Sequence, residues 1–229
     1  MSHRHSVQTH LGTAAADYDR VIRTFIPGYE QMLSTIGWWL SEIIPPDGQV
    51  IELGCGTGAL ALTVLTKLPE VRLEIWDIDP AMLAVARERL QKFGDRLTVR
   101  EQSFTEKLDS CNGVIASLSL HHLPTLDAKR AVYTNIFNAL REPGIFLNGD
   151  CTMDLTEPAH SVMLRYWVAF MAKHGITEAE ARKHFSEWAK EDTYQQISDE
   201  LRALVQAGFR RPDVFWKEGP MTVYGGIEA

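Results

Sequence analysis

The stretch Ile51-Glu52-Leu53-Gly54-Cys55-Gly56-Thr57-Gly58 carries three glycines at alternate positions. Glycine has no Cβ atom, so it permits positive φ angles and lets a ligand approach the backbone closely. If a helix follows the loop, the free N–H groups at its start point toward that ligand. Asp77 follows 23 positions after Gly54, where a carboxylate can accept hydrogen bonds from both hydroxyls of a ribose. The spacing therefore predicts a site for a cofactor that contains adenosine.

The loop alone leaves two such cofactors open. Gly54-x-Gly56-x-x-Ala59 also satisfies the dinucleotide fingerprint, in which the third position may be alanine. NAD and S-adenosylmethionine (SAM) both contain adenosine and both fit the loop. The choice between them depends on the surrounding sequence.

The elements around the loop are typical of a parallel sheet, because short β-branched runs alternate with helical stretches from about residue 49 onward. The predicted strands are Gln49–Leu53, Val71–Trp76, Arg96–Glu101, Gly113–Ser117 and Ile145–Gly149, the last entered through a turn at Pro143-Gly144. The predicted helices between them are Ala59–Leu68, a helix that opens at Asp79-Pro80 and ends by Gly94, and Leu126–Leu140. This order predicts a doubly wound α/β core.

Helical segments flank that core on both sides. Ala14–Leu40 is predicted to be helical with a break at Pro27-Gly28, and Pro158–Ala207 to form two or three helices rich in aromatic residues. Asp213–Lys217 and Thr222–Gly226 are predicted to form a β-hairpin.

Composition indicates one soluble domain. The chain has 229 residues, 45% of them hydrophobic, and a formal net charge of -7, which disfavours a nucleic-acid partner. No stretch reaches the roughly 18 apolar residues that span a bilayer, and the polar start of the chain lacks the features of a signal peptide. We therefore expect a cytoplasmic protein without a membrane partner. His160, His174 and His184 lack metal-ligand spacing, so no metal is expected.

Four motifs in the expected order resemble the class I SAM-dependent methyltransferase family. They are the glycine loop with Glu52 before it, the acidic turn Asp77-Ile78-Asp79-Pro80-Ala81-Met82-Leu83, the stretch Ser117-Leu118-Ser119-Leu120-His121-His122-Leu123-Pro124, and the turn Ala139-Leu140-Arg141-Glu142-Pro143-Gly144-Ile145-Phe146. The resemblance implies a Rossmann-like, mostly parallel sheet of seven strands with a reversed last strand, and N-terminal and C-terminal helical cap segments. It favours SAM over NAD.

The resemblance also implies one methyltransferase domain over residues 1–229. Residues 1–45 would be an N-terminal helical lid, 46–150 the SAM-binding core, 151–208 a helical cap with the acceptor region, and 209–229 the terminal hairpin. The implied activity is in-line methyl transfer from SAM to a small-molecule acceptor, with S-adenosylhomocysteine as the product. The aromatic-rich C-terminal helices offer a contact for a homodimer.

The cofactor-binding residues that follow from the motifs and the resemblance are Tyr18, Glu52, Gly54, Cys55, Gly56, Gly58, Asp77, Ile78, Met82, Ser103, Phe104 and Ser117. Ser103 stands where the family usually has an acidic residue for the adenine amino group. Gln102 or Ser103 can accept that hydrogen bond, and Phe104 is placed to stack on the base. Cys55 is expected to fill space, because no neighbouring cation in the sequence would depress the pKa of its thiol.

His121 and His122 are the candidate catalytic residues, because they follow the fourth strand and face the place where the methyl group would be presented. A histidine there can orient the acceptor or remove its proton, and His121 is the favoured base. The alternative is that one histidine caps the turn and the other packs.

Two stretches near the chain ends, Ile26-Pro27-Gly28-Tyr29-Glu30 and Ala207-Gly208-Phe209, are similar to carboxy-SAM synthases of tRNA wobble-uridine modification. Those synthases hold the extra carboxylate with an arginine, where this chain offers Phe185 or Ser186, with Arg182 nearby. Ordinary SAM is therefore expected. A carboxy-SAM synthase-like enzyme and a non-catalytic protein that binds NAD or SAM are the alternatives.

Overall fold

A seven-stranded sheet in the order β3-β2-β1-β4-β5-β7-β6 forms the centre of the computed structural model, which describes residues 17–228. The strands are β1 Gln49–Leu53, β2 Arg72–Asp77, β3 Leu97–Glu101, β4 Cys111–Ser117, β5 Leu140–Cys151, β6 Asp213–Glu218 and β7 Met221–Glu228. Strands β1 to β5 pair in parallel, and β7 is antiparallel to both of its neighbours. The predicted Rossmann-like sheet with a reversed last strand is confirmed.

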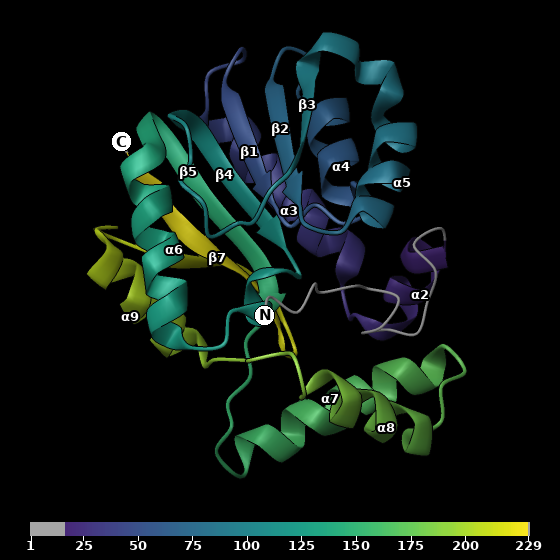
Figure 1. Ribbon diagram of the computed structural model, residues 1–229. Coiled ribbons are helices and arrows are strands. Elements are labelled where there is room, and N and C mark those ends of the chain that lie inside the picture. The colour runs from purple at the N-terminus through teal and green to yellow at the C-terminus, as the bar shows by residue number, and fades with distance from the viewer. Residues whose placement is uncertain (1–16, 229) are drawn as a thin grey trace, which may run out of the picture.

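Helices cover both faces of this sheet (Figure 1). One face carries α3 (Tyr29–Ile43), α4 (Ala59–Lys67) and α5 (Pro80–Leu90), and the other carries α6 (Leu126–Ala139) and α9 (Ile197–Ala207). Successive side chains of a strand point to opposite faces, so Ile145 and Leu147 of β5 join the core under α3 and α4. Phe146 joins the core under α6 and α9. A strand that is apolar on both faces is what such a layered fold requires.

The remaining helices lie together beyond the carboxyl ends of the parallel strands (Figure 1). They are α2 (Tyr18–Phe25), α7 (Ala159–Lys173) and α8 (Glu178–Trp188). The indole N–H of Trp167 in α7 donates to the carbonyl of Phe25 at 2.6 Å, and the Phe25 ring packs edge-on against Trp188 of α8. Helix α2, from the N-terminal part of the described chain, thus meets α7 and α8 in one helical cap over the sheet. None of the helices within residues 17–228 is long and apolar enough to cross a membrane.

The predicted helix break at Pro27-Gly28 is confirmed. Gly28 has φ 63°, and a Cβ atom there would lie 2.6 Å from the Trp216 ring, so only glycine fits between α2 and α3. The predicted helix began at Ala14, but residues 14–16 lie outside the described part of the chain.

The fifth strand is longer than predicted, and the predicted turn at Pro143-Gly144 lies inside it. β5 already begins at Leu140, which pairs with Cys111, while Ile145 pairs with Gly113. The segment with Pro143 is therefore an irregularity inside one strand. Proline has no N–H to give to the ladder, and an interruption of pairing is where a strand tolerates it.

A buried polar network joins the α6 and α9 layer to the sheet. Lys129 of α6 forms an ion pair with Glu200 of α9, and both side chains are fully buried. The Tyr133 hydroxyl donates to Glu200 Oε2 at 2.7 Å and lies 3.0 Å from the Tyr224 hydroxyl. That hydroxyl in turn accepts from the Asn148 amide at 2.8 Å. The network fixes two helices against β5 and β7.

We expect Glu200→Ala to lower the free energy of unfolding by about 3 kcal/mol or more, because it leaves the Lys129 ammonium buried without its partner. Replacing both residues, in Lys129→Met with Glu200→Leu, should restore most of that loss. Urea denaturation followed by circular dichroism measures both variants. A single variant as stable as the unmodified protein would contradict the role given to this pair.

Candidate functional site

The glycine loop joins β1 to α4 at the carboxyl edge of the sheet. Gly54 has φ 69°, and a Cβ atom there would lie 2.4 Å from the Ser119 Cβ, so the next loop crosses directly over it. Gly58, with φ 79°, precedes α4 and faces Leu90 of α5. Two different constraints therefore select glycine: close approach of a second loop at Gly54 and packing against a helix at Gly58.

Asp77 ends β2 beside this loop. Its Oδ2 accepts from the Gly56 N–H at 2.8 Å, and its Oδ1 accepts from the Asp79 N–H at 2.9 Å. Burial raises the pKa of Asp77, and the two backbone donors partly oppose that shift. Since an ionised carboxylate offers about four acceptor positions, Asp77 has capacity left for ligand hydroxyls.

Glu52 is the most strongly buried acid of the loop region, at 1% exposure. Its Oε2 has no hydrogen-bond partner among the described residues. Burial, with a further contribution from Asp77, raises the pKa of Glu52 well above its ordinary value. A buried carboxyl oxygen without a partner favours the arrival of a cationic ligand group.

Helix α2 is fastened to the glycine loop by Asp19. Its Oδ1 accepts from the Thr57 hydroxyl at 2.6 Å, and its Oδ2 forms an ion pair with Arg89 of α5. Arg89 also donates to the Thr57 hydroxyl at 3.1 Å. This Asp19-Thr57-Arg89 latch holds the neighbouring Tyr18 over the loop.

A single cavity collects most of the side chains predicted to bind the cofactor or act in catalysis. Those that line it are Tyr18, Glu52, Gly54, Cys55, Gly56, Asp77, Ile78, Met82, Phe104, Ser117, His121 and His122. Gly58 and Ser103 do not line it. The Ser103 hydroxyl instead lies 2.8 Å from that of Thr105, and Gln102 lines the cavity where Ser103 was expected. Burial raises the pKa of the Cys55 thiol well above its ordinary value, so the thiol stays protonated and fills space.

His121 stands at the far end of this cavity, held by Asp150 at the end of β5. The His121 Nδ1 lies 2.6 Å from Asp150 Oδ1, and the His121 backbone N–H donates to Asp150 Oδ2 at 3.1 Å. Burial alone would lower the pKa of His121, but the carboxylates of Asp150 and Asp192 outweigh burial and raise it. Because Asp150 occupies Nδ1, the ring presents Nε2 to the cavity.

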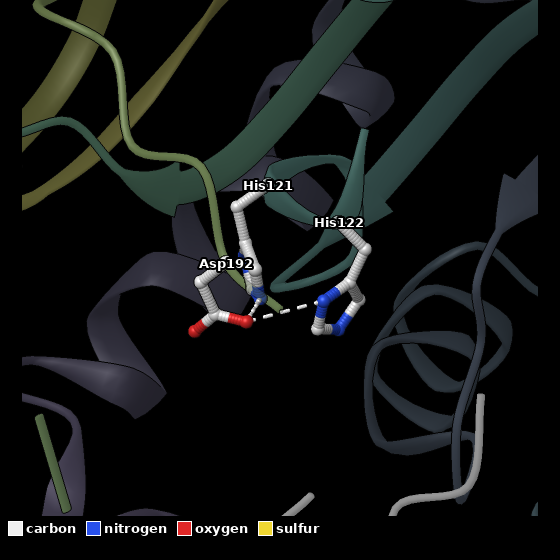
Figure 2. Close-up of side chains that lie close together, drawn as sticks. All are labelled: His121, His122 and Asp192. Carbon is white, nitrogen blue, oxygen red and sulfur yellow. Dashed lines mark ion pairs between the residues drawn. The ribbon is translucent and has the colours of Figure 1, made fainter. Parts of the chain in front are cut away.

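Asp192, between α8 and α9, brings His121 and His122 to one point (Figure 2). Its Oδ1 lies 3.2 Å from His122 Nδ1 and 3.7 Å from His121 Nε2. Its Oδ2 accepts from the Tyr194 hydroxyl at 2.7 Å. Burial would raise the pKa of Asp192, yet the two histidines and the Tyr194 hydroxyl lower it to about 2.

A tight turn after β4 orients the side chains of these two histidines. Leu118 adopts φ 51°, a left-handed conformation that costs a leucine about 1 kcal/mol or more. Its N–H donates to the Gly149 carbonyl at 2.8 Å, and the Ser119 hydroxyl donates to the Leu53 carbonyl at 2.8 Å. The neighbouring strands thus hold the turn in the conformation that points His121 into the cavity.

The polar residues that hold the two histidines, Asp150, Asp192 and Tyr194, do not appear among the sequence-based candidates. Asp150 could have been predicted. It lies at the end of β5, which pairs in parallel with β4, the strand before His121, and parallel strands end at the same edge of the sheet. Asp192 and Tyr194 carry no such signal. They follow α8 about 70 residues after the histidines and are placed by tertiary contacts, including the Thr193 N–H that donates to the His121 carbonyl at 2.7 Å.

Comparison with known families matches residues 51–146 to a methyltransferase domain. Those residues contain the glycine loop, Asp77 and both histidines. The chain carries a class I SAM-dependent methyltransferase domain. NAD is thereby disfavoured as the partner of the loop.

Similar proteins include two kinds of SAM enzyme. A carboxy-S-adenosyl-L-methionine synthase of Shewanella amazonensis is 26% identical over 215 residues, covering 89% of this chain and 85% of the relative. The structure of PigF with SAH has a TM-score of 0.66 at 15% identity, covering 99% of this chain and 63% of that one. The structure of human N-acetylserotonin methyltransferase with SAM has a TM-score of 0.59 at 17% identity. The match covers 98% of this chain and 63% of that one. This chain thus spans less than two thirds of the length of either of these two solved proteins, and their structures support the fold.

The buried carboxyl of Glu52 generates a prediction for the cofactor-free protein. Its raised pKa means that the folded state binds a proton more tightly than the unfolded state, so stability falls as pH rises above the ordinary value of 4.5. Glu52→Gln should remove this loss and raise the free energy of unfolding at pH 7 by about 1 kcal/mol. Urea denaturation of both proteins at pH 5 and pH 8 measures the effect. An equal pH dependence in the two proteins would contradict it.

Proposed function

We propose that this protein transfers the methyl group of SAM to a small-molecule acceptor. The observation that carries the proposal is that one cavity is lined at one end by the glycine loop, Glu52 and Asp77, and at the other by His121 and His122. A cofactor site that opens onto polar side chains at its other end is the arrangement expected for group transfer between two bound molecules.

The residues around the loop suit the parts of SAM. Asp77 would accept from the ribose hydroxyls, and Glu52 would pair with the ammonium of the methionine part. Phe104, Ile78 and Met82 provide an apolar surface for the adenine, with Gln102 as a polar group beside it. The ribose hydroxyls, the ammonium and the adenine of SAM would thereby each meet a group of complementary chemistry.

The sulfonium of SAM supplies an already activated methyl group, so the chain mainly has to align the acceptor and exclude water. Alignment equivalent to about 10⁵ M or more is worth roughly 7 kcal/mol of barrier. Trp167 and Trp188, both buried, line the histidine end of the cavity and exclude water there. The acceptor would lie between these rings and the histidines.

The similarity to carboxy-SAM synthases leaves ordinary SAM as the better-supported cofactor. Arg182, Phe185 and Ser186 line a second cavity between α7 and α8, beyond Trp167 and Trp188. The Arg182 guanidinium pairs with Glu178 on its own helix, and Phe185 packs on Trp167. No arginine among the described residues lines the loop cavity. Recovery of a carboxylated cofactor with the purified protein, seen by mass spectrometry, would contradict this choice.

Asp77→Ala should weaken SAM binding about 100-fold or more, because two hydrogen bonds to a charged acceptor, each worth about 1.5 kcal/mol or more, are lost. Isothermal titration calorimetry with SAM and S-adenosylhomocysteine measures the change, and titration with NAD should give no binding. Asp95→Ala, which removes an exposed carboxylate, is the matched control. Tight NAD binding in the absence of SAM binding would overturn the proposed function.

His121→Ala should leave the SAM affinity within about threefold of the unmodified protein and slow methyl transfer about 100-fold, as expected for loss of a group that acts on the acceptor. Transfer of labelled methyl from SAM to a panel of phenols, amines and carboxylic acids provides the assay. The exposed His174 provides the control variant, His174→Ala. Unchanged transfer in His121→Ala would remove His121 from the mechanism.

A further inference from the structure

We propose that His121, His122 and Asp192 bind a divalent transition-metal ion, Zn²⁺ being the ion that these ligands match best. In this site the ion would hold the nucleophilic oxygen of the acceptor, and that use of the ion rests on the proposed function. The site itself does not. It replaces the sequence-based expectation of no metal, which considered only the histidines at 160, 174 and 184.

The three side chains already approach the geometry of a metal centre (Figure 2). One ligand atom from each lies within 4.8 Å of the other two. Asp192 Oδ1 is 3.2 Å from His122 Nδ1 and 3.7 Å from His121 Nε2. Tetrahedral Zn²⁺ with bonds of about 2.0–2.1 Å to nitrogen and oxygen requires ligand atoms roughly 3.3–3.4 Å apart. The two measured separations lie on either side of that value.

Two of the three ligands are held by partners on the side away from the ion. Asp150 binds His121 Nδ1 at 2.6 Å, and the Tyr194 hydroxyl binds Asp192 Oδ2 at 2.7 Å. A carboxylate behind a ligating imidazole fixes its tautomer and orientation and strengthens it as a ligand. Simple packing of a histidine pair requires neither of these outer contacts.

Charge and burial also favour a cation. With neutral imidazoles, the cluster holds the two carboxylate charges of Asp150 and Asp192, whose side chains are 1% and 3% exposed. Buried charges are costly unless they are compensated. A proton on His121 compensates one of them, whereas a divalent ion compensates both.

Three protein ligands leave a fourth position open, as in catalytic rather than structural zinc sites. His121, His122 and Asp192 all line the cofactor cavity, and Asp192 also lines the second cavity between α7 and α8. The open position therefore lies where a ligand of either cavity can reach it. Two nitrogens and one oxygen suit Zn²⁺ or Fe²⁺ better than Mg²⁺, which prefers oxygen ligands.

In use, an acceptor hydroxyl would occupy the open position and lose its proton to solvent, because a bound Zn²⁺ lowers the pKa of an oxygen ligand. A lone pair of that oxygen then forms the bond to the methyl carbon. The C–S bond breaks with its electrons going to sulfur, and the sulfonium becomes a neutral thioether. His121 then acts as a ligand, and the ion takes over the activation expected of a general base.

Zn²⁺ titration of the full chain by calorimetry, after dialysis against a chelator and without SAM, tests the site. We expect about one ion per chain, and Co²⁺ in its place should give the visible bands of a four-coordinate ion. Asp192→Asn and His122→Ala should weaken Zn²⁺ binding roughly 100-fold or more, and Asp150→Asn, which keeps all three ligands, about 10- to 100-fold. SAM affinity close to that of the unmodified protein shows that each variant is folded.

The controls separate this site from other histidines. His174→Ala and a variant with alanine at His3, His5 and His10, which lie near the start of the sequence, should retain the full affinity. Zn²⁺ binding that is absent, unchanged in Asp192→Asn, or lost with the three early histidines would overturn the site. Methyl transfer unaffected by chelation would overturn the assigned use of the ion and leave the proposed function standing. Zn²⁺ binding without any methyl transfer would support the site and overturn the proposed function.

Discussion

The Asp150 carboxylate is the group on which the arrangement of the site depends. It is 1% exposed, so its oxygens need hydrogen bonds from the protein. It accepts from the backbone of His121 and Cys151 and binds the His121 ring, with the Asn148 amide 3.5 Å away. One buried charge thereby fixes the turn after β4 to the end of β5. Through Asn148 it also joins the network that reaches Glu200 and Lys129, so the position of His121 is linked to the packing of α6 and α9.

The cavity is assembled from three parts of the chain that the sheet alone does not connect. The carboxyl ends of β1, β2 and β4 supply the glycine loop, Asp77 and the histidines. Helix α2 covers the loop, and the segment after α8 brings Asp192 and Tyr194. Trp167 of α7 links these two covers, because its indole donates to the Phe25 carbonyl of α2 and its ring centroid lies 6.3 Å from that of Tyr194. Each cover is thus supported by the other as well as by the core.

The sheet and the loop could be predicted because their signals are local. Gly54 predicts a tight turn after the first strand, and Asp77 places a carboxylate at the end of the second. Short apolar runs predict the ends of most strands to within two residues of their observed bounds. β5 departs from this because the pairing of Leu140 with Cys111 extends it back past Pro143 through a bulge, and pairing with β7 extends it forward to Cys151. Asp192 could not be assigned to the site, because contacts formed only in the folded chain place it. The Ser103 prediction rested on alignment with a family pattern, and a shift of one residue along the loop brings Gln102 to the cavity instead.

The latch of Asp19, Thr57 and Arg89 has a consequence for exchange at the loop. Thr57 belongs to the segment that would contact the cofactor, Asp19 to the helix above it, and Arg89 to the helix beside it. Any displacement of α2 from the loop would therefore break a partly buried ion pair and a hydrogen bond together. Under the proposed function, the residence time of the cofactor would then depend on the Asp19–Arg89 pair, and substitutions on α5 could alter turnover without touching the ligand.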